Sequence, residues 1–213
     1  MSRRNKKGAS HWRKSQGTDP YFQKAKAEGY RARSAYKLLQ IQEKFRVLRA
    51  GQSVLDLGAA PGSWSQVAAK IVGSTGTVVA VDLQAIEPIP RVTAIQGDIT
   101  SPGTQRQMIE AAGGPVDVVL SDAAPNTSGI RERDHALSVE LVYAALDVAR
   151  QSLKPGGHFV AKVFEGEDLP PLIARLRGHF PLVKPHYPEA TRQESREIFL
   201  VCKGFAGQEG TRS

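Results

Sequence analysis

From residue 53 to residue 203, short runs rich in β-branched residues alternate with stretches of helical spacing. Strand patterns occur at 53–57, 77–81, 92–96, 116–120, 158–164, 181–186 and 197–202, and helical patterns at 64–72, 104–112, 135–152 and 172–177. Strands that alternate with helices are typical of a parallel sheet covered on both faces. No helical pattern separates the last two strands, so we expect an antiparallel closing strand. The sequence predicts an α/β fold with a doubly wound, mostly parallel, seven-stranded sheet.

The composition is that of a globular protein, since 40% of the 213 residues are hydrophobic and 23% are charged. A chain of this size can fold without disulfides or metal, and the single cysteine excludes an internal disulfide framework. No apolar run approaches the roughly 18 residues of a membrane span, and the basic N-terminus lacks the apolar segment of a secretory signal. The five histidines show no metal-ligand spacing. We expect a cytoplasmic monomer with no metal site and no membrane contact.

Positive charge is concentrated at the N-terminus. Residues 1–50 hold 14 of the 29 Lys and Arg but only three of the 21 acids. Such a segment on a near-neutral domain is typical of a polyanion binder. The aromatic residues among these bases can stack on unpaired nucleobases; they are Trp12, Tyr21, Phe22, Tyr30 and Tyr36. A solvated tail that aids solubility is the alternative.

These patterns define three parts of the chain. Residues 1–30 are expected to be a flexible, basic RNA-binding arm, although helical spacing begins near Asp19. Residues 31–203 are expected to be the folded domain, and residues 204–213 a frayed tail. The domain begins with a helix over 34–45, for which Ser34 is a candidate N-cap. Lys37 lies beside the apolar positions of this helix.

The most informative segment is a small-residue turn between the strand at 53–57 and the helix at 64–72. Its residues Gly58 to Gly62 allow a ligand to approach the backbone at the carboxyl end of the first strand. A dinucleotide fingerprint fails, because Ala60 and Ser63 stand where that pattern needs its second and third glycines. A phosphate-binding P-loop fails too, since no Gly-Lys-Ser/Thr follows.

Acidic residues are placed to complete this pocket. Asp82 follows the second strand and can accept both ribose hydroxyls of a nucleoside, while Asp98 follows the third strand and can reach the base. Together with Asp56 they would repel phosphates and suit a cationic nucleoside such as S-adenosylmethionine. The alternative is that each aspartate only caps a helix or a turn.

Four further charged residues lie next to predicted elements: Asp122 after the fourth strand, Lys162 within the fifth, Glu197 at the start of the last, and Lys37 on the N-terminal helix. A lysine flanked by apolar residues in a central strand is costly to bury without a partner. A purely structural Lys–Asp or Lys–Glu pair is therefore one explanation.

Methyl transfer to a ribose hydroxyl is the other explanation. The hydroxyl becomes a good nucleophile only as its proton is removed. A lysine can accept that proton if its pKa falls from about 10.4 towards neutrality, through burial or a second cation. Lys37 is the candidate second cation, while Asp122 and Glu197 would orient the ammonium groups and hold the ribose.

The chain resembles the FtsJ/RrmJ family of ribosomal RNA 2′-O-ribose methyltransferases from about residue 31 to residue 203. Five segments in order carry the resemblance: RSAYKL at 33–38, DLGAAPGSWSQ at 56–66, SDAAPN at 121–126, GGHFVAKVFEG at 156–166 and SRE at 195–197. The resemblance implies a Rossmann-like class I methyltransferase that uses S-adenosylmethionine. It also implies a uridine of large-subunit ribosomal RNA, in the assembled subunit, as the target.

The family's site residues can be placed on this sequence. The resemblance implies a catalytic tetrad of Lys37, Asp122, Lys162 and Glu197, and cofactor contacts at Gly62, Trp64, Asp82, Asp98 and Asp122. Ser63 and Ala123 depart from the residues that many members carry, but neither change removes a charged group. We interpret both as packing variants.

Two other functions stay open at this point. A base N-methyltransferase often carries Asp/Asn-Pro-Pro-aromatic after the fourth strand, whereas Ala-Ala-Pro-Asn follows Asp122 here. An RNA-binding ribosome assembly factor with a retained cofactor pocket is the second alternative. It predicts that replacing Lys162 would leave the biological role intact.

Overall fold

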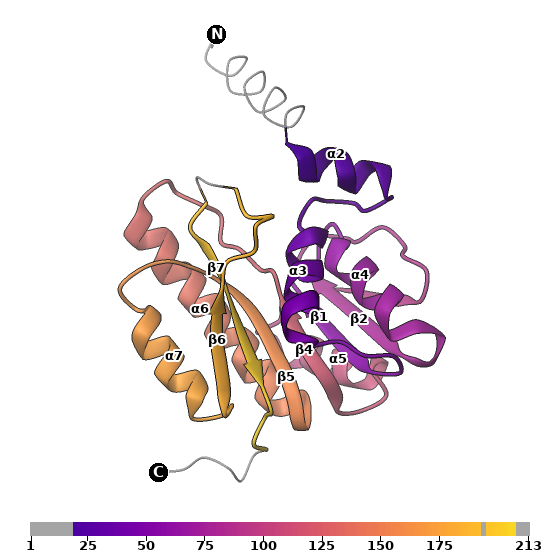
Figure 1. Ribbon diagram of the computed structural model, residues 1–213. Helices are drawn as coiled ribbons and strands as arrows, with labels where there is room; N and C mark the ends of the chain where they lie inside the picture. The colour runs from indigo at the N-terminus through magenta and orange to yellow at the C-terminus, as the bar shows by residue number, and fades with distance from the viewer. Residues whose placement is uncertain (1–18, 193–194, 208–213) are drawn as a thin grey trace, which may run out of the picture.

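A single seven-stranded sheet with the order β3-β2-β1-β4-β5-β7-β6 forms the centre of the protein (Figure 1). The computed structural model describes residues 19–192 and 195–207. The strands are β1 (Ser53–Leu57), β2 (Thr77–Asp82), β3 (Val92–Gln96), β4 (Val116–Ser121), β5 (Leu153–Phe164), β6 (Leu182–His186) and β7 (Glu197–Lys203). β1 to β5 pair in parallel, and β7 runs antiparallel to both β5 and β6. The predicted fold class and the antiparallel closing strand are confirmed.

Helices cover both faces of the sheet. The helices are α2 (Pro20–Ala27), α3 (Ala35–Phe45), α4 (Ser63–Val72), α5 (Pro102–Ala111), α6 (Arg131–Ser152) and α7 (Leu169–Arg177), with a short 3₁₀ turn at Gly73–Thr75. Apolar residues of α3 and α4 form one core with one face of the sheet, and those of α5, α6 and α7 form a second core with the other face. None of the helices in the described part of the chain is long and apolar enough to cross a membrane.

Strand alternation decides which side chains point to which core. Val160 of β5 belongs to the core under α3 and α4, whereas Phe159 and Ala161 belong to the opposite core. Because side chains alternate along a strand, Lys162 lies on the α3 face with Val160. Lys162 is therefore on the same side of the sheet as Lys37 of α3.

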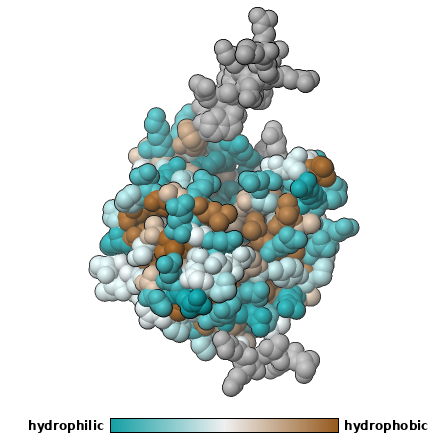
Figure 2. Space-filling model, turned by 180° about the vertical axis from the view of Figure 1, so that it is seen from behind, coloured by the Kyte–Doolittle hydropathy of each residue, from teal (hydrophilic) through white to brown (hydrophobic). Residues whose placement is uncertain are grey.

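Large apolar side chains reach the surface in few places. On the face shown in Figure 2, hydrophobic residues lie in separate groups among hydrophilic ones. The exposed large hydrophobic residues among those described are Leu83, Ile130, Tyr143, Leu182 and Tyr187. Leu83 is the most exposed of them, at 69%, and lies at the mouth of the cavity described below.

The arm and the tail differ from the sequence-based expectation. Within the predicted arm over 1–30, residues from Asp19 onward are folded: Ala25 of α2 packs against Tyr36 and Ala190. Within the predicted tail over 204–213, Phe205 is buried in the α6 core and donates its backbone N–H to Gly157. The remaining residues of the arm (1–18) and of the tail (208–213) lie outside the described part of the chain.

Candidate functional site

A cavity of about 810 Å³ opens at the carboxyl ends of β1, β2 and β4. This is where open α/β sheets bind ligands. It is lined by the turn after β1, the ends of β2 and β3, the segment after β4 and one side of α6. The lining residues include Gly58, Asp82, Asp98, Asp122, Glu140 and Lys162. The predicted pocket is therefore present, with acids on several of its walls.

The turn after β1 requires glycine at its first position. Gly58 has a φ of 67°, and an added Cβ would lie 2.7 Å from the Cα of Ala123. The turn ends at Gly62, which begins α4 with a φ of 105°. Arg31 braces the outside of the turn by donating to the carbonyl oxygen of Pro61 at 2.8 Å. Glycine thus lets the turn approach the segment after β4 closely.

Two of the predicted cofactor residues lie outside the cavity. The indole of Trp64 is buried against Phe199 and donates to the carbonyl oxygen of Ser34 at 2.9 Å. Gly62 does not line the cavity either, because its missing side chain would point towards Ile89. Gly62 and Trp64 can therefore contact a ligand only through their backbone atoms at the start of α4.

Asp82 and Asp98 both line the cavity and both hold a turn. Asp82 accepts backbone N–H groups of Ala60 at 2.9 Å and Gln84 at 2.8 Å. Asp98 accepts the backbone N–H and the hydroxyl of Thr100, and these hydrogen bonds lower the pKa of Asp98. Both aspartates therefore cap turns, as the alternative predicts, and also line the cavity, while their contact with a nucleoside stays a prediction.

Asp56 is separate from the other acids. Its side chain is fully buried in β1, below the cavity, and accepts the Ser65 hydroxyl at 2.5 Å. Burial, with smaller contributions from the charges of Asp122 and Asp82, raises the pKa of Asp56 to about 7. Asp56 thus lies near the pocket, as predicted, but its side chain packs under α4 and does not line the cavity.

Asp56→Asn is expected to reduce the pH dependence of stability between about pH 4 and about pH 7. The folded state holds the Asp56 proton more tightly than the unfolded state, whose value is near 3.8, so the wild type loses stability as the pH rises through this window. As the pH rises through this window, the free energy of unfolding of the variant should therefore increase relative to that of the wild type, by up to about 1.4 kcal/mol per pH unit. Urea unfolding measured from about pH 5 to about pH 8 tests this.

Asp134→Asn is the matched control for this measurement. Hydrogen bonds, first that from the backbone N–H of Ser128, lower the pKa of Asp134. Asp134 therefore stabilises the fold at every pH above its unfolded-state pKa, so the difference in stability between Asp134→Asn and the wild type should stay constant across the Asp56 window and shrink only at a lower pH. A constant difference between Asp56→Asn and the wild type across the whole range would contradict the assignment.

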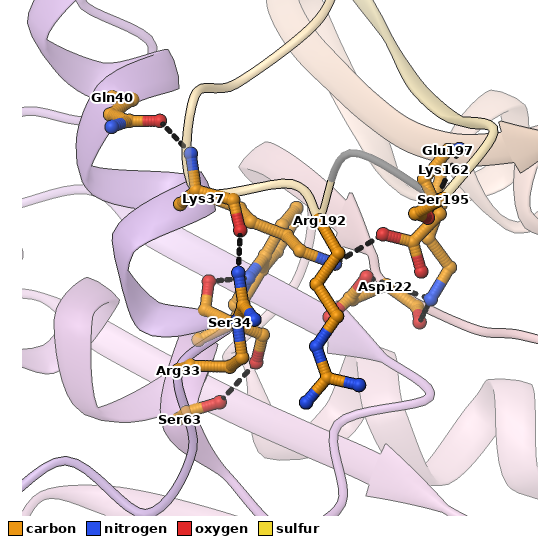
Figure 3. A network of polar contacts seen from close by, with 12 residues as sticks. Arg33, Ser34, Lys37, Gln40, Ser63, Asp122, Lys162, Arg192, Ser195 and Glu197 are labelled. Carbon is orange, nitrogen blue, oxygen red and sulfur yellow. Dashed lines mark hydrogen bonds and ion pairs between the residues drawn. The ribbon is translucent and has the colours of Figure 1, made fainter. Parts of the chain in front are cut away.

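The four tetrad residues meet as two lysine–carboxylate pairs (Figure 3). Lys162 Nζ lies 2.9 Å from Asp122 Oδ1 and donates to the backbone carbonyl oxygen of Asp122 at 2.6 Å. Lys37 forms an ion pair with Glu197 and lies 5.7 Å from the centre of the Phe199 ring. Each lysine is only 8% exposed. All four residues come together: Asp122 follows β4, Lys162 lies in β5, Glu197 begins β7 and Lys37 lies in α3.

The two pairs influence each other. Burial favours the neutral form of Glu197, but the charges of Lys37 and Lys162 outweigh it and lower the pKa of Glu197. Lys162 and Asp122 line the large cavity, whereas Lys37 and Glu197 line a second cavity of about 390 Å³. The pairs therefore lie between two cavities that can hold two different molecules.

The second cavity contains residues to which the sequence analysis gave no role. Arg33, Arg192 and Ser195 line it together with Lys37 and Glu197. Arg33 and Ser195 stand inside two of the segments that carry the family resemblance, which is a signal that could have been used. Arg192 lies in the connection between β6 and β7, where the pattern gives no indication of its position.

Comparisons with known proteins agree with this geometry. A family model described as FtsJ-like methyltransferase matches residues 30–205. Two proteins named ribosomal RNA large subunit methyltransferase E are similar over most of their length. The one from Methanothrix thermoacetophila is 51% identical over 87% of this chain and 72% of its own. The one from Pseudomonas aeruginosa is 44% identical over 95% of this chain and 98% of its own.

Solved structures show the same fold. A protein of Plasmodium falciparum described as a ribosomal RNA methyltransferase superimposes with a TM-score of 0.76 at 33% identity. The match covers 84% of this chain and 100% of that one. The fibrillarin/Nop5p complex gives a TM-score of 0.58 at 20% identity, which supports the fold alone.

Proposed function

The chain belongs to the FtsJ-like methyltransferase family, and we propose that it methylates the ribose 2′-hydroxyl of a uridine in large-subunit ribosomal RNA, with S-adenosylmethionine as the donor. The target is proposed to be the assembled large subunit. One observation carries the proposal: two buried lysine–carboxylate pairs lie between an acid-lined cavity and a second, arginine-lined cavity. The names of the relatives agree with ribosomal RNA as the substrate class.

The larger cavity suits a cationic nucleoside. Among its described lining residues, Lys162 is the one cation, and Asp122 pairs with it. Asp82 and Asp98 keep carboxylate oxygens at the ends of β2 and β3, where they can accept ribose hydroxyls and contact a base. Negative walls disfavour a phosphate and favour a sulfonium. When bound, S-adenosylmethionine supplies an electrophilic methyl carbon.

The two lysine–carboxylate pairs can accept the proton that the attacking ribose 2′-hydroxyl loses. Asp122 holds Lys162 Nζ by its carboxylate and its backbone oxygen, so the amine is fixed at the wall of the donor cavity. In its neutral form this amine takes the 2′-hydroxyl proton while the oxygen attacks. Lys37 supplies the second positive charge, and Glu197 holds Lys37 in place. Placing the oxygen in line with the methyl carbon accounts for much of the rate.

Transfer of a radiolabelled methyl group to purified large ribosomal subunits tests the proposal. The subunits are prepared from a strain that lacks the gene, and the labelled nucleotide is mapped by nuclease digestion and mass analysis. We expect the label on a uridine ribose. Label on a base would instead support the N-methyltransferase alternative. No label on subunits or on naked RNA would support the assembly-factor alternative.

The basic segment at residues 1–18, which lies outside the described part of the chain, is proposed to bind ribosomal RNA through its phosphates. Residues 2–18 hold six Lys and Arg and no acid. Deleting them is expected to weaken RNA binding, and the slope of log K against log salt should fall by about 0.7–0.9 for each phosphate that the segment neutralises. Filter binding at several salt concentrations measures this slope. An unchanged slope would show that the segment serves only solubility.

A further inference from the structure

Asp19 joins three parts of the chain that are far apart in the sequence. It stands at the start of α2, and its side chain is only 7% exposed. Its Oδ2 atom forms an ion pair with Arg33, which precedes α3, and lies 3.5 Å from Nε of Arg192, in the connection between β6 and β7. Both arginines line the second cavity, beside Lys37 and Glu197.

The connection between β6 and β7 rests on α2 and α3. The backbone N–H of Ala190 donates to Gln40 of α3 at 3.0 Å, and Arg33 donates to the carbonyl oxygen of Ala190. Ala190 itself is fully buried against Ala25 and Tyr36. The same connection continues to Ser195 and then to Glu197, the partner of Lys37. Helix α2 therefore supports the connection between β6 and β7, which positions Glu197.

The two oxygens of Asp19 have different partners. Oδ1 accepts the backbone N–H groups of Tyr21 and Phe22, which caps α2. Oδ2 contacts the two guanidinium groups. Asp19 could instead fill the binding site of an RNA phosphate and move away when RNA binds. In that case helix α2 would lose its N-terminal cap and two ion pairs would break. This favours a permanent support over a temporary occupant.

The charges around Arg33 explain why a carboxylate is needed here. Burial lowers the pKa of Arg33, Asp19 opposes this effect, and the nearby charge of Arg192 adds to it. Without Asp19 the two guanidinium groups would repel each other. With it, Arg192 remains 47% exposed at its side chain and lines the cavity that also holds Lys37 and Glu197, with its guanidinium group extending away from their contact (Figure 3).

We propose that Asp19 is a positioning residue for the RNA side of the reaction, which holds Arg33 and Arg192 where they bind a backbone phosphate next to the reacting ribose. This inference rests on the proposed function. Two guanidinium groups that meet at one carboxylate match the hydrogen-bonding geometry of a phosphate. The Lys37–Glu197 pair lines the same cavity, which places that phosphate next to the proposed ribose site.

Asp19→Asn tests the inference, with Glu110→Gln as the matched control. Glu110 is exposed on α5, far from this cavity in the fold, and its replacement removes the same charge. Loss of an acid should by charge alone tighten RNA binding. We instead expect Asp19→Asn to raise the KM for RNA roughly tenfold, as expected for loss of one charge-assisted contact, with unchanged donor affinity. Glu110→Gln should leave KM unchanged or slightly lower.

A double variant shows whether the effect passes through Arg192. In an Arg192→Ala background, Asp19→Asn should change KM by less than about twofold, because the group it positions is gone. Asp19→Glu should restore part of the RNA affinity, which separates positioning from misfolding. Equal or tighter RNA binding by Asp19→Asn than by Glu110→Gln would overturn the inference, and so would a full tenfold effect in the double variant. Absence of 2′-O-methylation by the wild type would instead refute the proposed function.

Discussion

Replacing Lys162 by alanine is expected to abolish methyl transfer and to leave donor affinity within a few-fold of the wild type. The amine is held at the boundary of the donor cavity by two atoms of Asp122, and it is the one cationic side chain among the described residues that line this cavity. General base catalysis is worth about 10²–10⁴-fold in rate. Donor affinity should change little, because the carboxylates that face the nucleoside remain. Single-turnover methyl transfer and calorimetric titration of S-adenosylmethionine measure the two effects.

Lys154→Ala is the matched control for this variant. Lys154 is also on β5 and also pairs with an aspartate, Asp117, at 3.0 Å, but it is exposed at the opposite end of the strand. Its loss should leave the rate within about twofold, since exposed ion pairs contribute little. Substantial residual transfer by Lys162→Ala would remove Lys162 from the proposed role and leave Lys37 as the proton acceptor to test.

Asp82→Ala is expected to show the opposite pattern to Lys162→Ala, with its main effect on the affinity for the donor instead of on the rate. Asp82 fixes the turn after β1 through Ala60 and the segment after β2 through Gln84, and it also faces the cavity. A hydrogen bond to a charged group is worth about 1.5–3 kcal/mol, so the Kd for S-adenosylmethionine should rise roughly ten- to a hundredfold. At a saturating donor concentration much of the rate should return.

Asp147→Asn removes an acid from the exposed side of α6 and serves as the control for charge. Its donor affinity should match that of the wild type. If Asp82→Ala bound the donor as tightly as this control, the cavity at the ends of β2 and β3 would not be the donor site. Comparing the two variants with Lys162→Ala separates donor binding from proton transfer.

The sheet and most of the site could be predicted because both depend on local patterns. Strands such as β1 and β3 are short apolar runs bounded by polar turns, and their predicted bounds are those of the structure. Residues at the carboxyl ends of parallel strands meet at one edge, which is why Asp82 and Asp98 could be grouped from the strand pattern, while Asp122 joined them through the family resemblance. Helix α6 begins four residues earlier than predicted, at Arg131, because charged residues in its first turn hide the apolar spacing.

The remaining features depend on contacts between distant segments. Helix α2 has only eight residues, and its burial becomes visible only when Tyr36 and Ala190 pack against it. Asp56 could be placed near the pocket by its position in the first strand, but only its burial under α4, where it accepts the Ser65 hydroxyl, shows that it does not line the cavity. The role of Arg192 follows from a connection without periodicity, which no local pattern predicts.

The antiparallel direction of β7 has a consequence for the order in which the enzyme matures. Glu197, the first residue of β7, pairs in register with Phe164 at the far end of β5, and β7 lies between β5 and β6. During translation, the residues that line the donor cavity are therefore synthesised before Glu197, the acid that pairs with Lys37. In the proposed mechanism, competence for chemistry therefore arrives only once Glu197 has been translated, so a product that ended before this residue would carry the residues of the donor cavity without the partner of Lys37.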